Sequence, residues 1–532
     1  MKKNTIKLTK ENFVTQITRF GFFAEQIPDC FTTEAFSNNA EKLLESISIG
    51  TNQAKNGNKN ATSPIIISTY KNELSRRLIS ISNPEAFLRV VKLMQKEWDK
   101  INSYSYSNNS LSPITIIADY NSNNMEFINE ESVRNHYFIK SDFVKNIKEC
   151  IRAALGYRYR LSVDISNFYN SIYTHSISWA ICEKKMAKKY HITKEPESLK
   201  SLYEFADHLD AFTRFQKNNE TNGIVVGPYT SRIFSEILLS RIDKELTDKK
   251  LLFRRYVDDY KFYFRSEYQA KQSLNIIENT LNEYNLNLNQ AKTELVKFPF
   301  DTISNINNKY KEVYEKSGTF EVLNQAGQLY QSGEKGAYKY ALKFLKNKYL
   351  DLSEFELIWP LLINIMLLDP KYGKYIIIYI KEHLAKLNLK DIENIINEEL
   401  KNSLKENLQQ EILLFLSFVK ELKLCVTGEN MVSIFKTRDD LSLIIALDLW
   451  KNRNQKVIRT RKEAKEINKL INELFNELKS ASCKGEHWLL LYEIRQHKFA
   501  KEKDYAYPDL DLDFFKKMEK LKISFYSSVK RK

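Results

Sequence analysis

Two periods of apolar and polar positions divide the chain. Between residues 157 and 300, short runs such as YRYRLSVD and YKFYF alternate or cluster apolar residues between turn-forming stretches. After residue 309, apolar residues recur every three or four positions, with short polar separators. Alternation is typical of half-buried strands, and the longer period is typical of amphipathic helices. The pattern therefore predicts a mixed α and β region followed by an all-helical region.

The change of pattern falls near residues 301–309, which predicts one domain over 1–305 and a second over 306–532. A chain of 532 residues is longer than one hydrophobic core usually supports. Segments such as EFELIWPLLINIMLL and LQQEILLFLSFVKEL predict stacked antiparallel helix pairs. Because no strict period repeats, we expect a degenerate, HEAT-like helical-repeat domain. Its surface would bind a partner chain, hold product DNA, or support oligomerisation.

Two adjacent carboxylates mark the mixed region. Asp258 and Asp259 lie between strand-like runs in LLFRRYVDDYKFYF, which predicts a hairpin with the acids at its tip. Asp164 ends an earlier alternating run, 94 residues before Asp258. Taken alone, the pair would be explained by a solvated turn. Together with Asp164 it predicts acids from different strands at one site.

Such a group of acids is suited to a divalent cation. Mg²⁺ prefers octahedral oxygen ligation and keeps waters and substrate phosphates, so one or two protein carboxylates suffice. In a two-metal site, one ion activates an attacking 3′ oxygen and the other neutralises the leaving pyrophosphate. We assign Asp164 and Asp258 as bridging ligands and Asp259 as a weaker or outer ligand. The expected cofactor is Mg²⁺, with Mn²⁺ as an alternative.

The segments between and after these acids also contain candidate substrate contacts. In TNGIVVGPYTSRIF, the glycines before a helix pattern would let the backbone approach a substrate, although Gly227 and Pro228 also suit a plain helix start. Lys292, in QAKTEL beside a short strand, could reach a triphosphate or lie in solvent. The order of the pieces favours the functional interpretation.

In this order, the four segments resemble the palm of reverse transcriptases. SVDISNFYNSI corresponds to motif A, VGPYTSR to motif B, YVDD to motif C and QAKTEL to motif D. The resemblance implies an α+β right-hand polymerase, with fingers and palm, that transfers nucleotidyl units from dNTPs to DNA. The implied catalytic residues are Asp164, Asp258 and Asp259, with Ile165 added to the metal ligands.

The resemblance also implies which residues contact the dNTP. Tyr169, the fifth residue after Asp164, takes the steric-gate position, where its ring would collide with a 2′ hydroxyl and select deoxynucleotides. An aromatic residue there could equally be core packing. Gly227 and Lys292 are the further dNTP contacts, and Arg152, with Lys140 behind it, is the candidate basic residue of the fingers.

A narrower resemblance joins DISNFYNSIYTHSISWAI, VGPYTSRIFSEILLSRID and the C-terminal phrase HWLLLYE to the abortive-infection (Abi-type) defence reverse transcriptases of bacteria. It implies an anti-phage role, priming from a protein hydroxyl with a covalent protein–DNA link, synthesis without a conventional template, and a homo-oligomer. Val226 stands where templated reverse transcriptases commonly have Gln, which weakens the case for templated copying. Tyr104 and Tyr106 are candidate priming residues.

The N-terminal region is less regular. Residues 50–63 predict an exposed loop, and SYSYSNNS (residues 103–110) predicts a polar, mobile segment. Fingers elements are expected between and after these two stretches.

Composition supports a nucleic-acid partner and excludes other classes. A net charge of +15 and a pI near 9.1 favour a polyanion, so single-stranded DNA, and RNA as a second candidate, are expected partners. Five widely spaced cysteines argue against disulfides and zinc, which fits the cytoplasm. The sequence has no phosphate-binding glycine loop, signal peptide, membrane span or second acidic cluster of RNase H type.

Two rival interpretations remain open. The first is a templated reverse transcriptase that copies a dedicated RNA. The second is a nucleic-acid-binding scaffold whose palm is catalytically idle. The joint presence of Asp164, Asp258, Tyr169 and Lys292 argues against the idle scaffold, because binding alone would not require all four.

Overall fold

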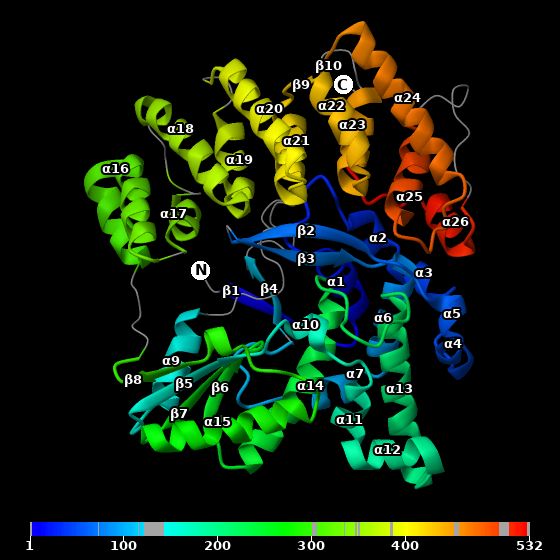
Figure 1. Ribbon diagram of the computed structural model, residues 1–532, viewed down its shortest axis with the longest axis vertical. Helices are drawn as coiled ribbons and strands as arrows, with labels where there is room; N and C mark the ends of the chain where they lie inside the picture. The colour runs from blue at the N-terminus through cyan, green and yellow to red at the C-terminus, as the bar shows by residue number, and fades with distance from the viewer. Residues whose placement is uncertain are drawn as a thin grey trace.

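A computed structural model describes residues 3–72, 74–114, 116–121, 143–300, 306–334, 336–345, 348, 352–383, 387–451, 457–499 and 510–528. In Figure 1 a lower part is built around a twisted sheet, and an arc of helices from α16 to α26 lies above it. The β2–β3 hairpin lies between the two parts. The change from mixed to helical structure follows the predicted pattern.

The sheet of the lower part is antiparallel and four-stranded, in the order β6-β7-β5-β8. Leu161 and Val163 point into the core, as the alternating pattern of the first strand predicts. The predicted hairpin around YVDD is present. The strands are β5 (Tyr159–Asp164), β6 (Phe253–Tyr256), β7 (Asp259–Phe264) and β8 (Glu294–Lys297).

Helices pack on this sheet and beside it. They are α10 (Phe168–Ser171), α11 (Ser176–Cys182), α12 (Lys184–Thr193), η1 (Glu197–Leu199), α13 (Lys200–Phe215), α14 (Tyr229–Asp248), α15 (Glu267–Asn282) and η2 (Gln290–Lys292). α14 differs from the amphipathic helix predicted there, because 15 of its 20 residues are buried. Its charged residues must therefore find partners inside the protein.

The N-terminal elements form a second group of short helices and hairpins. They are β1 (Lys3–Lys7), α1 (Phe13–Phe20), α2 (Glu34–Asn38), α3 (Ala40–Leu44), α4 (Thr51–Lys55), α5 (Gly57–Asn60), β2 (Ile65–Asn72), β3 (Ser75–Ile81), α6 (Pro84–Lys96), α7 (Trp98–Tyr104), β4 (Ile116–Asn121) and α9 (Phe143–Ala153). β1 pairs with β4, and β2 pairs with β3, both antiparallel.

The upper part is helical, with one small exception. Its elements are α16 (Ile306–Gln331), α17 (Ala337–Leu345), α18 (Leu352–Leu368), η3 (Pro370–Tyr372), α19 (Gly373–Glu382), α20 (Leu389–Lys405), α21 (Gln409–Leu422), β9 (Val426–Thr427), α22 (Gly428–Thr437), α23 (Asp440–Lys451), β10 (Val457–Ile458), α24 (Arg461–Leu478), α25 (Trp488–His497) and α26 (Asp513–Lys520). β9 and β10 form a parallel pair that the all-helical prediction missed. Two residues are too few to show an alternating pattern.

The N-terminus of α21 joins the helical part to the β2–β3 hairpin. The side-chain carbonyls of Gln409 and Gln410 accept hydrogen bonds from the main-chain amides of Ser68 (2.6 Å) and Tyr70 (2.7 Å) on β2. Next to them, Glu411 pairs with Arg76 through two contacts of 2.5 and 2.7 Å. Side chains of α21 therefore take the place of a neighbouring strand at the β2 edge.

The last described residues return to the N-terminal elements. Phe525 is fully buried against the rings of Phe22, Phe36 and Trp488, at centroid distances of 5.4, 5.2 and 5.7 Å. Glu493, in the HWLLLYE phrase, accepts a 2.7 Å hydrogen bond from the Phe525 amide. The phrase thus anchors the C-terminal segment to the first helices of the chain.

Two loop predictions need correction. Residues 50–63 contain the short helices α4 and α5, and their described side chains are exposed or partly exposed, except for the buried Ala54 and Thr62. Residues 103–110 are not a free polar segment, because Ser105 is buried and its carbonyl accepts a 2.8 Å hydrogen bond from the Ser240 hydroxyl on α14. Serine hydroxyls can satisfy buried polar groups, so a polar composition did not require exposure here.

The five cysteines are free thiols, in agreement with the absence of a disulfide pattern. In the described part of the chain, no helix combines the length and the apolar character needed to cross a membrane.

Candidate active site

Three carboxylates meet at one end of the sheet. β5 and β7 run antiparallel with Asp164 directly opposite Asp259. Asp258 lies in the turn between β6 and β7, where Tyr256 is paired with Asp259. Val257, the other turn residue, has a φ of +56°, a left-handed conformation that is unusual for a β-branched side chain. The predicted meeting of acids from two strands is therefore present in the structure.

Burial and the neighbouring acids raise the pKa values of Asp258 and Asp259. Burial is the main cause that raises the pKa of Asp259 to about 6, and a hydrogen bond with Asp164 and the charge of Asp258 raise it further. Burial also raises the pKa of Asp258, with the charge of Asp164 as an added cause. Three acids this close repel one another when all are ionised, so the site favours a bound proton or a cation.

A lysine and an asparagine approach Asp164 from the segment before β8. Lys292 places its ammonium nitrogen 3.1 Å from Asp164 Oδ2. Asn289 donates to the same oxygen at 2.8 Å, and its main-chain amide donates to the Asp164 carbonyl, also at 2.8 Å. Lys292 therefore lies at the site. Its described ion pair is with Asp164, and its predicted contact with a triphosphate stays a prediction. Asn289 was not predicted, because one asparagine within LNLNQAK gives no distinctive signal.

Tyr169 lies next to the same acids. It is on α10, behind Asn167, which has a left-handed φ of +46° and turns the chain sharply after β5. Burial raises the pKa of Tyr169, while the nearby charge of Arg232 and a hydrogen bond with Ser235 oppose this shift. The charge of Asp258 also acts on the Tyr169 hydroxyl. The Tyr169 hydroxyl thus lies within electrostatic range of Asp258 and of α14, and its role as the steric gate stays a prediction.

Gly227 contacts the fingers. Its φ is +132°, and a Cβ atom there would come within 3.1 Å of both Ala24 Cβ and the Ser80 carbonyl. The neighbouring Val226 carbonyl accepts a 2.6 Å hydrogen bond from the Ser80 amide on β3. Glycine is therefore needed where the loop before α14 packs against the β2–β3 hairpin. The structure gives this packing reason for Gly227, and its predicted dNTP contact stays a prediction.

Other predicted residues are not joined to the carboxylates by contacts in the described part of the chain. Arg152 is 73% exposed and pairs with Glu149 at 2.7 Å, within α9. The Tyr106 hydroxyl donates to Asn108, also at the surface. Burial raises the pKa of Tyr104. Lys140 lies outside the described residues.

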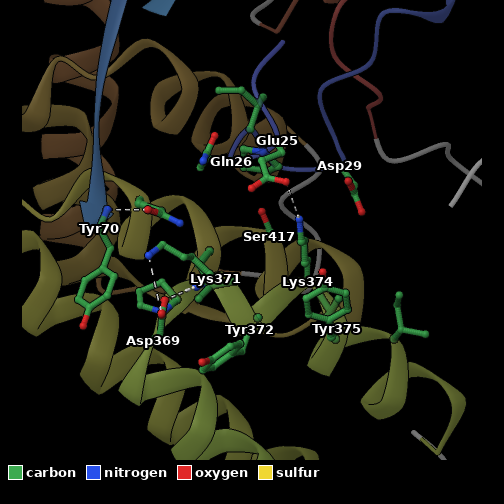
Figure 2. Close-up of a pocket in the computed structure, with 18 of the residues that line it drawn as sticks. Glu25, Gln26, Asp29, Tyr70, Asp369, Lys371, Tyr372, Lys374, Tyr375 and Ser417 are labelled. Atoms are coloured by element: carbon green, nitrogen blue, oxygen red, sulfur yellow. Dashed lines mark hydrogen bonds and ion pairs between the residues drawn. The ribbon is translucent and has the colours of Figure 1, made fainter. Parts of the chain in front are cut away.

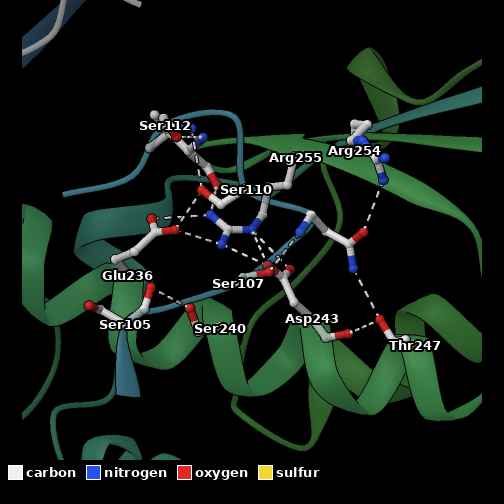
Figure 3. Close-up of polar contacts among 12 residues, drawn as sticks. Ser105, Ser107, Ser110, Ser112, Glu236, Ser240, Asp243, Thr247, Arg254 and Arg255 are labelled. Atoms are coloured by element: carbon white, nitrogen blue, oxygen red, sulfur yellow. Dashed lines mark hydrogen bonds and ion pairs between the residues drawn. The ribbon is translucent and has the colours of Figure 1, made fainter. Parts of the chain in front are cut away.

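A buried arginine, Arg255, comes just before the Asp-Asp turn in the chain, and Figure 3 shows it between Glu236 and Asp243. Arg255, which is fully buried, forms two contacts with Asp243, from Nε at 2.9 Å and from Nη2 at 2.7 Å. It also donates from Nη2 to Glu236 at 2.8 Å. Both acids are on α14, and their charges raise the pKa of Arg255 far above its usual range although burial opposes this. A fully paired buried cation of this kind fixes the position of β6 on α14.

The same arginine holds the turn itself. Arg255 Nη1 donates to the Val257 carbonyl at 2.8 Å, and the Ser112 hydroxyl accepts from the Val257 amide at 3.0 Å. Ser110 donates to Glu236 at 2.8 Å. Both main-chain groups of the left-handed Val257 are thus bonded to a rigid frame. We call Arg255, Glu236, Asp243, Ser110 and Ser112 the turn-support network.

Part of this network could have been predicted from the spacing of its acids in the sequence. Glu236 and Asp243 are seven residues apart, on the same helix face as the apolar residues Ile233 and Leu239 nearby, and Arg255 directly precedes the YVDD turn. Buried acids on an apolar helix face require a cation. The choice between Arg254 and Arg255 needed the strand register, which places Arg255 on the inward side.

The carboxylates fit a divalent cation. Among the described residues, no group of three or more His, Cys, Asp or Glu side chains is arranged so that it could hold a metal ion by itself. Mg²⁺ does not need one, because waters and substrate phosphates complete its shell. A cation among Asp164, Asp258 and Asp259 would relieve the repulsion that adds to the effect of burial on the pKa values of Asp258 and Asp259. Ile165 has a buried apolar side chain, so only its main-chain carbonyl could serve as a ligand.

Residues 71–323 match the family model for reverse transcriptase (RNA-dependent DNA polymerase). A comparison with curated proteins gives no match. Similar solved structures include apo telomerase from Candida tropicalis, at 16% identity over 68% of each chain with a TM-score of 0.30. Telomerase from Candida albicans in complex with a TWJ fragment of telomeric RNA is similar at 11% identity, over 72% of this chain and 65% of that one, with a TM-score of 0.27. The match includes the residues of the carboxylate site in its range and supports a nucleotidyltransferase activity of the RNA-directed DNA polymerase class.

The turn-support network predicts a large stability effect at one arginine and a small one at its neighbour. Arg255→Met keeps the side-chain volume but leaves buried acids without their cation, so we expect the free energy of unfolding to fall by roughly 3–5 kcal/mol. Arg254→Met, which removes a 3.2 Å contact with Asn109, should cost under about 1 kcal/mol. Denaturant unfolding of both variants measures the difference. Equal losses would show that the network does not hold the turn.

The raised pKa of Asp259 predicts a pH effect on metal-free protein. Its pKa is about 6 in the folded state, against an ordinary value of 3.8, so the folded state binds more protons between these values. Stability from this group is therefore present at lower pH and is lost as the pH rises through about 6. Asp259→Asn should reduce the change of the unfolding midpoint with pH between about pH 4 and about pH 6. The exposed control Asp513→Asn should leave this pH dependence unchanged. An unchanged slope in Asp259→Asn would contradict the assignment.

Proposed function

We propose that the chain is an active DNA polymerase of reverse-transcriptase type that adds deoxynucleotides by two-metal nucleotidyl transfer. The observation that supports this most is the meeting of Asp164, Asp258 and Asp259 at one end of the sheet, inside the matched range. The acceptor would be a 3′ hydroxyl or a protein hydroxyl. The leaving group would be pyrophosphate.

Divalent cations would activate the acceptor oxygen and neutralise the pyrophosphate when bound at this site. Asp164 and Asp258 would hold them from two different strands, and Asp259 would orient Asp164 through their hydrogen bond. Lys292 lies 3.1 Å from Asp164 and has a half-exposed side chain, so it can move to a triphosphate once a metal neutralises the acid. Tyr169 would close the site on the sugar side.

We further propose, from the resemblance to Abi-type enzymes, that synthesis is protein-primed and needs no template, and that the protein acts as a homo-oligomer in bacterial anti-phage defence. Val226 supports the untemplated mode. A valine side chain has no amide to offer a template base pair, and the main-chain carbonyl of Val226 is bonded to the Ser80 amide. The HEAT-like assignment of the helical domain belongs to this proposal.

Templated copying of an RNA is the second candidate. It is favoured by the family model, whose description is an RNA-dependent DNA polymerase. The two candidates share the metal site and differ in the primer and in the need for a template.

Asp258→Asn tests the shared chemistry. Replacing the acid with its amide removes a metal charge with little change in shape, so incorporation of labelled dNTPs should fall by at least about a hundredfold. Asp248→Asn, at the end of α14, is the matched control and should keep full activity. Full activity in correctly folded Asp258→Asn would contradict the metal assignment.

The same assay separates the modes of synthesis when purified, nuclease-treated protein is resolved on denaturing gels before and after proteinase. Label that migrates with the protein and is released as DNA supports protein priming. Label that appears only when RNA and a primer are added supports templated copying. No incorporation under either condition would favour the idle scaffold.

Tyr169→Ala tests the sugar gate. Loss of the ring should open the sugar side, so the preference for dNTPs over ribonucleotides should fall by about tenfold or more. Competition between matched deoxy- and ribonucleotides measures this ratio. Tyr173→Ala, on the same segment, is the control. A ratio unchanged in Tyr169→Ala would place the gate elsewhere.

A further inference from the structure

A cavity of about 1070 Å³ lies away from the carboxylates, between the tip of the β2–β3 hairpin and the helical part (Figure 2). Its walls come from the loop after α1, from the hairpin tip, and from η3, α19 and α21. The end of the described chain, at Ser528, also lines it. The volume is at the upper end of that of ordinary ligand pockets. The cavity thus joins the fingers, the helical part and the C-terminal segment.

The walls carry an excess of positive charge. Seven lysines and four carboxylates line the cavity among the described residues. Part of this charge is paired, since Lys381 lies 2.8 Å from Glu421 and Lys374 lies 3.9 Å from Glu25. Of the other five lysines, Lys420 lies 4.0 Å from Asp448, and Lys423 follows α21. The remaining three are Lys71, Lys339 and Lys371.

The carboxylate of Asp369 is the internal partner of these lysines. Lys371 lies 3.8 Å from Asp369, and the charge of Lys339 also acts on this carboxylate. Lys71 and Lys339 form no ion pair with any described residue. Lys71, Lys339 and Lys371 are all exposed. Three ammonium groups thus share one carboxylate, which leaves positive charge available for an anionic ligand.

Aromatic rings lie among the lysines. Lys371 lies 5.1 Å from the ring centroid of Tyr70, at the hairpin tip. Tyr330 is half-buried like Tyr70, and both are close enough to affect the pKa of the buried Tyr372. Figure 2 shows Tyr70 and Lys371 together at one end of the cavity. Half-buried tyrosine faces beside lysines are suited to stacked bases with adjacent phosphates.

We infer that this cavity binds single-stranded nucleic acid, with bases stacked on Tyr70 and Tyr330 and phosphates near Lys71, Lys339 and Lys371. The inference rests on the proposed function only for the source of the strand, which would be the polymerase product. A duplex hides its base faces, so a single strand is the form that these rings can stack on.

The position of the hairpin gives the cavity a path to the polymerase site. The tip of β2–β3 lines the cavity, while Ser80, at the other end of β3, is bonded to Val226 in the loop before α14. Arg76, between these ends, is held by Glu411 of α21. A strand bound at the tip would therefore contact the element that packs on the motif B loop.

The test is binding of a fluorescent single strand of about 15 nucleotides to the full-length protein without dNTPs. The variant Lys71→Ala/Lys339→Ala/Lys371→Ala removes the three exposed charges of the cavity. The control Lys462→Ala/Lys465→Ala/Lys469→Ala removes three exposed lysines from α24 and lowers the net charge equally. A second pair compares Tyr70→Ala with Tyr268→Ala, whose tyrosine is 72% exposed.

We expect the cavity variant to lose at least about tenfold in affinity, with the slope of log K against log salt reduced by roughly 2, at about 0.7 for each lost contact. Tyr70→Ala should lose about fivefold or more. Both controls should stay within about twofold of the original protein. Equal losses in the cavity and α24 variants, or tighter binding of a duplex, would overturn the inference.

Photocrosslinking separates this site from the polymerase site. A strand carrying 5-bromodeoxyuridine should crosslink to Tyr70 or Tyr330, as mapped by mass spectrometry, and should do so equally in Asp258→Asn. Crosslinks confined to the segments around Asp164 and Asp258 would overturn the inference. Because no dNTP is present, crosslinking at Tyr70 stands even if Asp258→Asn shows that the proposed chemistry is wrong.

Discussion

The buried pairing of Arg255 with Glu236 and Asp243 is the interaction on which the candidate active site depends. It fixes β6 on α14 and, through Nη1, holds the carbonyl of a turn residue that has a left-handed backbone. Desolvating three charges is costly, and the cost is offset only because each group has close partners. The result is a rigid turn that positions Asp258, while the Asp258 carboxylate is not itself part of the turn-support network.

That rigidity explains how the site keeps three acids together. Asp164, Asp258 and Asp259 lie close together. Burial raises the pKa values of Asp258 and Asp259, and the charge of Asp164 adds to both shifts. A flexible turn would relax by moving the acids apart. Here the strand register fixes Asp164 opposite Asp259, and the turn-support network fixes Asp258. The repulsion among the three carboxylates therefore persists in the folded protein, and a bound cation would relieve it. Nucleotidyl transfer uses a preorganised charged site of this kind.

Local patterns predicted the strands and the hairpin, because alternation and turn residues act over a few positions. The meeting of Asp164 with Asp258, 94 residues apart, was predicted from the order of the motifs instead. Local patterns predicted helices for the second half of the chain, which the structure confirms, except for the β9–β10 pair. They missed Asn289, the docking of Ser110 and Ser112, and the contact of Gly227 with Ser80. Each of these contacts joins segments far apart in sequence, so its partner cannot be identified from local spacing. The role of Arg152 has no support from contacts in the described structure and stays a prediction.

The most direct test of the account is Mn²⁺ binding followed by electron paramagnetic resonance, in the presence of a non-hydrolysable dNTP. The unaltered protein and Asp248→Asn should bind Mn²⁺. Asp164→Asn/Asp258→Asn should lose at least about a hundredfold in Mn²⁺ affinity. Arg255→Lys, which keeps the charge but not the planar fork, should fall between them. Undiminished Mn²⁺ binding by the folded double variant would contradict the central claim that these carboxylates form the metal site.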